Sequence, residues 1–142
     1  MLNIELNSPS APLAVGVYPH ARQVGDFLFL SGIGPRERGT DIIPGVNLDD
    51  KKNIISYNIE EQCHSVFKNV RTVLEDCNSS WMNLVDVQVF LTNMKDDFAS
   101  YNKLYKDYFA ENRPTRTTIE ISSLPTPIAI ELKCIALINK KA

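Results

Sequence analysis

The chain has 142 residues, of which 44% are hydrophobic and 23% charged, and its formal net charge is -2. This length suits one domain with a sizeable core and is too short for two ordinary domains. The slight excess of acidic residues argues against a protein that binds the phosphate backbone of a nucleic acid. The first residues show no basic segment followed by an apolar one, as a signal peptide would, and no apolar run reaches the roughly 18 residues of a membrane span. We therefore expect a single cytoplasmic domain over residues 1–142.

Cysteines and histidines are too scattered to suggest a metal centre. Cys63, Cys77 and Cys134 form no CxxC pair, and His20 and His64 form neither an HxxxH nor an HExxH motif. An odd number of cysteines without such spacing also argues against a disulfide framework. We expect three buried thiols and no metal.

The first elements follow a polar lead that is punctuated by proline. Residues 24–31, rich in aromatic and branched side chains, predict a strand that Gly32 and Gly34 terminate. Residues 35–53 combine glycine, proline and charged residues, which predicts a loop with a short returning strand at residues 42–43.

Two helices are predicted by apolar residues at three- and four-residue steps. The first begins after Ser56 or Asn58, either of which can cap it, and ends near residues 78–80. The second begins near Lys95 or Asp96 and is broken by Asn112, Arg113 and Pro114. Its stripe is strongly aromatic, and we expect core packing from Phe98, Tyr101, Leu104, Tyr105, Tyr108 and Phe109.

Three more strands are predicted over residues 85–92, 115–121 and 128–138. The order of elements predicts an α+β fold with a mixed sheet and two helices on one face. The last strand is apolar on both faces, and two helices can cover only one of them. Because soluble monomers rarely expose such a face, we expect a homo-oligomer.

Two charges interrupt the apolar strands, Arg116 and Glu131. A half-buried charge is costly unless it is paired. One explanation is structural: the two side chains pair with each other or with Lys133, or Arg116 lies at a solvent-exposed strand end. The functional alternative is a site in which the arginine fork binds a substrate carboxylate and a carboxylate activates water. Glu120, on the same strand face as Arg116, is a competing acid. The pattern alone thus predicts an oligomeric α+β protein with a candidate site for an anionic ligand.

The stretch "RPTRTTIEISSLPTPIAIELKCIALI" resembles the C-terminal signature of the RidA (YjgF) enamine/imine deaminases. Further matches are "GVYPHA" at 16–21, "GDFLFLSG" at 25–32, "FKNVRTVLE" at 67–75 and "VFLTNMKDDFASYNKLYKDYF" at 89–109. The resemblance covers nearly the whole chain. It implies a chorismate-mutase-like α+β fold, a homotrimer with a central β-barrel, and active sites in clefts between subunits.

The resemblance also implies an activity and a set of site residues. The family hydrolyses 2-imino or 2-enamino acids to 2-keto acids and ammonia without a cofactor. By match to the signature, Arg116 binds the substrate carboxylate and Glu131 positions the attacking water. The positions that line the family's cleft correspond to Tyr18, Ser31, Gly32, Asn102 and Thr118, where Thr118 replaces a cysteine found in many members.

Departures from the housekeeping pattern resemble the 2-aminomuconate deaminase branch. They are "YPHARQVGDFLFLSG", the loop "GPRERGTDIIPGV" and "RPTRTTIE". 2-Aminomuconate carries two carboxylates, so we expect Arg36 or Arg38 to contact the second one, and His20 to transfer the proton that converts enamine to imine. The alternatives are solvent-exposed arginines and a histidine that only lines the cleft.

Other functions remain open on the sequence. One is a general deaminase for 2-iminobutyrate and 2-iminopropanoate, and another is a small-ligand-binding or chaperone-like member that uses the same clefts. Glu131 favours an enzyme, because a second negative charge beside a bound carboxylate would weaken simple binding. Cleavage of RNA fits poorly with the net charge and the absence of a basic patch in the sequence.

Overall fold

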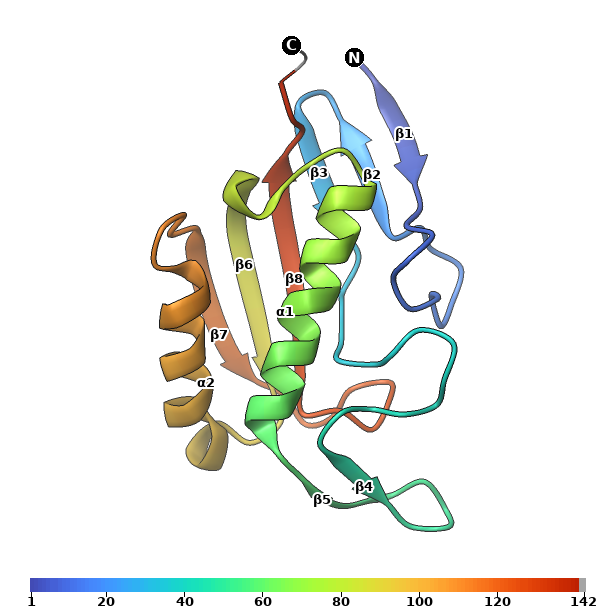
Figure 1. Ribbon diagram of the computed structural model, residues 1–142, viewed down its shortest axis with the longest axis vertical. Helices are drawn as coiled ribbons and strands as arrows, with labels where there is room; N and C mark the ends of the chain where they lie inside the picture. The colour runs from blue at the N-terminus through green and yellow to red at the C-terminus, as the bar shows by residue number, and fades with distance from the viewer. Residues whose placement is uncertain (141–142) are drawn as a thin grey trace.

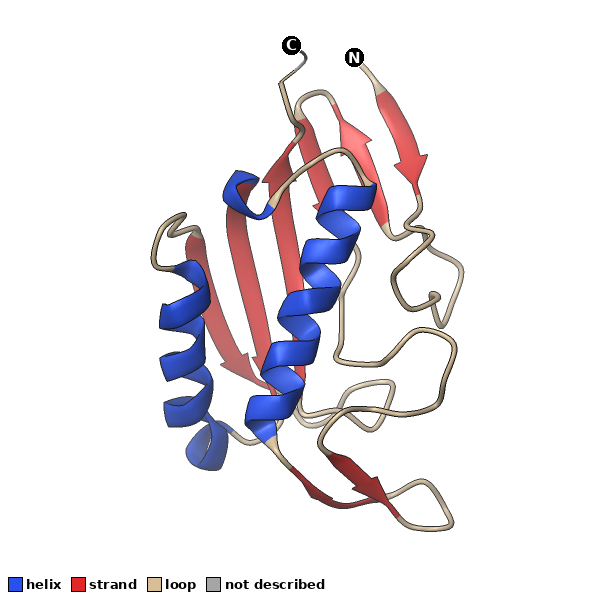
Figure 2. Ribbon diagram, in the orientation of Figure 1, coloured by secondary structure: helices blue, strands red, loops and turns tan. Residues whose placement is uncertain are grey.

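The computed structural model describes residues 1–140, and it places two helices on one face of a six-stranded sheet (Figures 1 and 2). The strand order is β1-β2-β3-β8-β6-β7, and a separate two-stranded ribbon joins β4 to β5. The predicted α+β class with a mixed sheet is confirmed. The strands are β1 (Asn3–Leu6), β2 (Ala21–Val24), β3 (Phe27–Leu30), β4 (Val46–Leu48), β5 (Ile54–Tyr57), β6 (Leu84–Leu91), β7 (Thr115–Glu120) and β8 (Ile130–Leu137).

The two helices are α1 (Ile59–Asp76) and α2 (Met94–Phe109), and a short 3-10 turn, η1 (Trp81–Asn83), precedes β6. Asn58 caps α1 by accepting a hydrogen bond from the Glu61 amide at 3.1 Å. Asn93 caps α2 in the same way, and acidic residues follow in both first turns, where they favour the positive end of the helix dipole. Within residues 1–140, no helix has the length and apolarity needed to cross a membrane.

Strand pairing follows from the connections between the elements. All neighbouring strands run antiparallel except β6 and β7, which are parallel and joined through α2. A parallel pair needs a crossover of this kind, because a tight turn cannot return the chain to the same end of the sheet. In consequence, α2 packs beside β7 (Figure 1). Arg116 of β7 contacts this helix through a hydrogen bond to Asn102.

The core lies between the helices and one face of the sheet. Every second residue of β8 is fully buried there, namely Ile130, Leu132, Cys134 and Ala136. The expected burial of all three cysteines is confirmed. The aromatic stripe of α2 is core at Tyr101, Tyr105 and Phe109, whereas Phe98 is 37% exposed.

Two expectations for the first half of the chain are wrong. The lead contains two strands, β1 and β2, and the expected strand at 24–31 is divided, because Gly25 adopts a left-handed φ of 60° and turns the chain between β2 and β3. No strand forms at residues 42–43. Ile43 is buried as a loop residue instead, and the hairpin comes later as β4 and β5.

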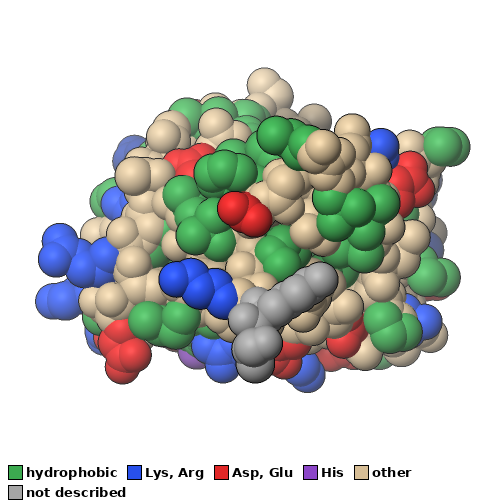
Figure 3. All heavy atoms as spheres, turned by 90° about the horizontal axis from the view of Figure 1, so that it is seen from above, with side chains coloured by type: hydrophobic (Ala, Val, Ile, Leu, Met, Phe, Trp, Pro, Cys, Tyr) green, Lys and Arg blue, Asp and Glu red, His purple; other side chains and the backbone are tan. Residues whose placement is uncertain are grey.

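The sheet face without helices is rich in exposed apolar side chains. Phe27, Phe29, Ile119 and Leu137 are 46%, 38%, 43% and 40% exposed. The view from above looks onto one end of the strands, where hydrophobic side chains lie among acidic and basic ones (Figure 3). The apolar second face inferred from the last strand is therefore present in the fold.

Candidate functional site

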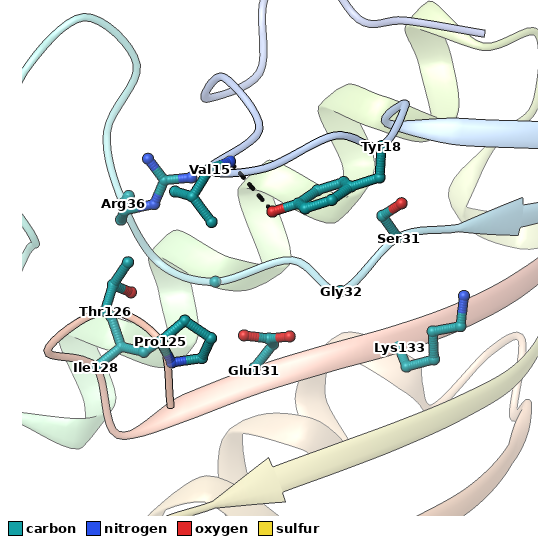
Figure 4. A pocket seen from close by; sticks show the side chains of 11 residues that line it. Val15, Tyr18, Ser31, Gly32, Arg36, Pro125, Thr126, Ile128, Glu131 and Lys133 are labelled. Atoms are coloured by element: carbon teal, nitrogen blue, oxygen red, sulfur yellow. Dashed lines mark hydrogen bonds between the residues drawn. The ribbon is translucent and has the colours of Figure 1, made fainter. Parts of the chain in front are cut away.

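A cavity of about 410 Å³ opens beside Glu131, and we call it the Glu131 cavity. Its floor is β8, one wall is the segment 31–36 that follows β3, and its roof is the strap, defined here as residues 11–18 (Figure 4). The lining residues are Val15, Tyr18, Ser31, Gly32, Gly34, Arg36, Pro125, Thr126, Ile128, Glu131 and Lys133.

Glu131 reaches the cavity because β8 alternates its side chains between the two sheet faces. Ile130 and Leu132 are buried under the helices, so Glu131 projects to the opposite face. Its carboxylate lies directly against Gly32, where a Cβ atom would stand only 2.1 Å from Glu131 Oε1. Burial raises the pKa of the Glu131 carboxyl above its ordinary value, and the positive charge of Arg36 lowers it in part. The absent side chain of Gly32 therefore provides the space in which this carboxylate sits.

Tyr18 and Ser31 line the same cavity, as expected from the resemblance. The Tyr18 hydroxyl accepts a hydrogen bond from the Val15 amide at 3.2 Å and points into the cavity (Figure 4). The Ser31 hydroxyl donates to the Pro19 carbonyl at 2.7 Å. Tyr18 is thus held by the strap that it helps to close, and Ser31 ties the end of β3 to the same part of the chain.

Three side chains expected to meet the substrate bind consecutive carbonyls of the strap. Arg38 Nη1 donates to the Ala11 carbonyl at 2.7 Å, and Arg36 Nη2 donates to the Leu13 carbonyl at 2.8 Å. His20 accepts from the Ser8 amide at Nδ1, so its Nε2 carries the proton and donates to the Pro12 carbonyl at 2.7 Å.

These contacts show that Arg36, Arg38 and His20 lie in different surroundings. Arg36 lines the Glu131 cavity and keeps further N–H donors beyond the one that holds the strap. Arg38 lies outside that cavity, in a different hollow beside α1. Both ring nitrogens of His20 are engaged by backbone groups, so His20 holds the strap in this structure, and its role in proton transfer stays a prediction.

Arg116 lies in a second hollow, of about 550 Å³, which we call the Arg116 groove. Its Nη1 donates to Asn102 Oδ1 at 2.7 Å, and its guanidinium carbon lies 4.7 Å from the Tyr105 ring centre. Thr118 lies two residues along β7 and hydrogen-bonds the Tyr101 hydroxyl at 2.8 Å. The groove is lined by Asn102, Tyr105, Lys106, Phe109, Ala110, Arg113, Pro114 and Arg116.

Arg116 and Glu131 lie on opposite faces of the sheet within one chain. Arg116 pairs with Val87 across β6 and β7, and Val87 is fully buried on the helix side. Glu131 pairs with Phe90, and residues 87 and 90 of a strand face opposite ways. The two charges therefore do not pair, and among residues 1–140 the salt bridge within 4.0 Å is that of Arg22 with Glu5. One chain holds two separate candidate half-sites, one that contains Glu131 and one that contains Arg116.

Glu120 has a structural role. Its Oε1 accepts a hydrogen bond from the Met94 amide at 2.9 Å, at the first turn of α2. Glu131 lines the Glu131 cavity, whereas Glu120 lies on the sheet face that carries Arg116 and is bound to the first turn of α2.

Sequence reasoning gave too little weight to three cations. Lys133 appeared only as a pairing partner, yet it lines the Glu131 cavity and its amine donates to the Leu30 carbonyl. Lys106 and Arg113 also line the Arg116 groove. Arg113 was interpreted only as part of a helix break, and Lys106 was not singled out, because nothing in the periodicity of α2 distinguishes it from other exposed lysines.

Comparison with known proteins places the chain in a family. The model of the family described as Endoribonuclease L-PSP matches residues 8–138. The chain belongs to this family. It is 34% identical to a RutC family protein of Pyrococcus abyssi over 126 residues, which are 89% of this chain and 90% of the relative. It is 33% identical to Protein HMF1 of Saccharomyces cerevisiae over 127 residues, 89% of this chain and 88% of that protein.

Solved structures agree with this assignment. The crystal structure of yeast Mmf1 aligns with a TM-score of 0.83 and 29% identity, over 97% of this chain and all of that one. TdcF of E. coli, solved with bound serine, aligns with a TM-score of 0.80 and 26% identity, over 96% and 99% of the two chains. The YjgF gene product of E. coli aligns with a TM-score of 0.79 and 25% identity, over 94% and 98%. The resemblance to the YjgF family drawn from the sequence is confirmed.

Proposed function

We propose that this L-PSP family member is a cofactor-independent deaminase that hydrolyses 2-enamino and 2-imino acids to 2-keto acids and ammonia. One observation carries the proposal: Glu131 is held in a cavity with raised carboxyl pKa, while Arg116 is presented, with no acid beside it, on the other face of the sheet. These are the two groups that such a hydrolysis needs, a carboxylate that orients water and a fork that binds a carboxylate.

The reaction balances without a cofactor. Protonation at carbon and loss of one N–H proton convert the enamine to the imine, and water then adds to the C=N carbon while Glu131 accepts one of its protons. That proton passes to the nitrogen and gives a carbinolamine. The hydroxyl proton of the carbinolamine then moves to the nitrogen as the C=O bond forms and the C–N bond breaks, and the products are the 2-keto acid and ammonia. A base that must accept a proton near neutral pH benefits from a raised pKa, and burial supplies that rise at Glu131.

We further propose that the two half-sites meet between copies of the chain in a homotrimer. The apolar side chains on the open sheet face need a cover, and a second copy supplies one. The Arg116 groove of one subunit would then complete the Glu131 cavity of its neighbour. TdcF was solved with bound serine, an amino acid with the same carboxylate group, which supports a carboxylate ligand in this family.

Our leading candidate substrate is 2-aminomuconate, which carries a second carboxylate. Of the two loop arginines, only Arg36 lines the Glu131 cavity, and it retains free donors, so we assign the contact with the second carboxylate to Arg36. Arg38 holds the strap and has no place in that contact. Simpler substrates such as 2-iminobutyrate would leave Arg36 without this partner.

The test is ammonia release from 2-aminomuconate, and from 2-iminobutyrate or 2-aminoacrylate generated in situ, by wild type, Arg116→Ala and Glu131→Gln. We expect each variant to be inactive alone. Co-refolding the two in equal amounts should restore roughly a quarter of wild-type activity, because each site then draws its two halves at random from the two variants. Recovery to this level requires that Arg116 and Glu131 come from different subunits.

A second candidate function is binding of small carboxylates without turnover. If wild type binds 2-keto acids but consumes none of these substrates, the binding function replaces the deaminase. RNA cleavage, which the family's description names, is checked in the same series. Hydrolysis of RNA that disappears in Glu131→Gln would contradict the proposed substrate class.

A further inference from the structure

The Arg116 groove concentrates positive charge on a chain whose net charge is negative. Three cationic side chains, Lys106, Arg113 and Arg116, line it together with Asn102, and no acidic residue is among its lining residues. The formal net charge of the chain is -2, so this local excess opposes the overall balance. Its floor is apolar and aromatic, from Tyr105 and Phe109. This combination suits a small organic anion with a flat or unsaturated body.

The backbone directs these charges to one place. Lys106 lies one turn beyond Asn102 on the same face of α2, so both side chains face the groove. Arg113 adopts a left-handed φ of 45°, and its amide donates to the Phe109 carbonyl at 3.0 Å, which closes the end of α2 and returns the chain beside the groove. A left-handed conformation is uncommon for a residue with a Cβ atom, so this arrangement is held by its surroundings.

The nearby acids do not cancel this charge within the groove. Asp107 and Glu111 are exposed and do not line it. Asp86 accepts a hydrogen bond from the Thr115 hydroxyl at 2.6 Å and also lies outside the lining. Lys106 and Arg113 are themselves exposed, and they are free of the side-chain hydrogen bond that anchors Arg116 to Asn102.

We propose that Lys106 and Arg113 are specificity-determining residues that make the Arg116 groove an entry site for small organic anions with two acidic groups. They act through their field: clefts lined by one sign of charge raise the local concentration of oppositely charged ligands by about 10 to 1,000-fold. This inference rests on the proposed function only in assigning the substrate carboxylate to Arg116. It adds a reason for preferring dianions that does not depend on the Arg36 contact in the other half-site.

The electrostatic field of the groove can be distinguished from a specific contact by how its effect depends on the charge of the ligand. The free energy of a ligand in a potential is proportional to its charge, so a change that weakens binding of a monoanion by a given factor weakens binding of a dianion by the square of that factor. Two removed charges at this range should cost a monoanion roughly tenfold at low ionic strength and a dianion roughly 100-fold. Physiological salt should reduce both effects, because exposed charges are screened over about 8 Å.

The experiment uses the full chain and two unreactive probes, 2-oxobutyrate as the monoanion and 2-oxoglutarate as the dianion. Calorimetric affinities are compared for wild type, Lys106→Gln/Arg113→Gln, and a control, Lys51→Gln/Lys95→Gln, which removes the same charge from exposed residues outside the groove. We expect the squared relation in the groove variant and wild-type affinities in the control. Lys106→Gln alone provides the same comparison at half the charge if the double variant unfolds.

Equal losses for both probes, equal losses in the control, or no binding of either probe to wild type would overturn the inference. Failure of the proposed function is a separate result, because the probes need no turnover. A protein that shows the squared relation but releases no ammonia keeps the groove as an anion site and loses the deaminase.

Discussion

Replacing Gly32 by alanine tests whether the position of the Glu131 carboxylate is what makes the site active. The new Cβ would lie 2.1 Å from Glu131 Oε1 and 3.1 Å from its Cδ. Non-bonded heavy atoms rest at about 3.5 Å, so the oxygen must retreat by about 1.4 Å. Gly32 is not among the glycines with positive φ, so the backbone tolerates a side chain there.

The expected loss follows from that displacement. A misplacement of about 1 Å in a catalytic group can cost roughly 100-fold in rate, which is about 2.7 kcal/mol of transition-state stabilisation. The clashing atom is the end of a flexible side chain, so folding should be affected little. We expect kcat for ammonia release to fall about 100-fold while the melting temperature changes by no more than about 3 °C.

The matched comparison is Gly34→Ala, in the same segment. Its Cβ would lie 2.8 Å from Ile128 Cδ1 and would not touch the carboxylate. We expect a loss of less than tenfold from this variant. Full activity in Gly32→Ala, or the same large loss in both variants, would refute the assignment of Glu131 as the water-orienting group.

Further predictions follow from other contacts of the site. Glu120→Ala removes the acceptor for the Met94 amide, so it should lower stability by about 1 kcal/mol in thermal unfolding and leave kcat unchanged. Activity requires ionised Glu131, and burial raises the pKa of its carboxyl, so the acidic limb of the pH–rate profile should lie above the ordinary carboxyl pKa of 4.5. The positive charge of Arg36 lowers this pKa, so Arg36→Gln should move the limb to still higher pH. Arg38→Gln frees one strap carbonyl, so amide hydrogen exchange of the strap should accelerate and kcat should fall although Arg38 lies outside the cavity; unchanged exchange would contradict this role.

The periodic elements were accessible from the sequence because their physical causes are local. The apolar stripe of α1 and the alternation along β8 follow from side-chain spacing alone, whereas the cap of α1 was left between Ser56 and Asn58 until the structure identified Asn58. The N-terminal strands β1 and β2 were missed because each is only four residues long, too short for a clear alternation, and because β1 pairs with β2 across a segment of 14 residues. The division of the predicted strand at 24–31 was missed because its apolar residues read as one continuous strand, although Gly25 makes a left-handed turn within it.

The sequence by itself determined the fold class, the apolar second face of β8 and, through the family signature, the pair of candidate residues Arg116 and Glu131. Only the tertiary structure decided how they are arranged. Strand register places the two charges on opposite faces of the sheet, and the strap binds His20 and Arg38 through its carbonyls. Spacing along a chain specifies which face of an element a residue occupies, but the partners on that face come from segments distant in the sequence.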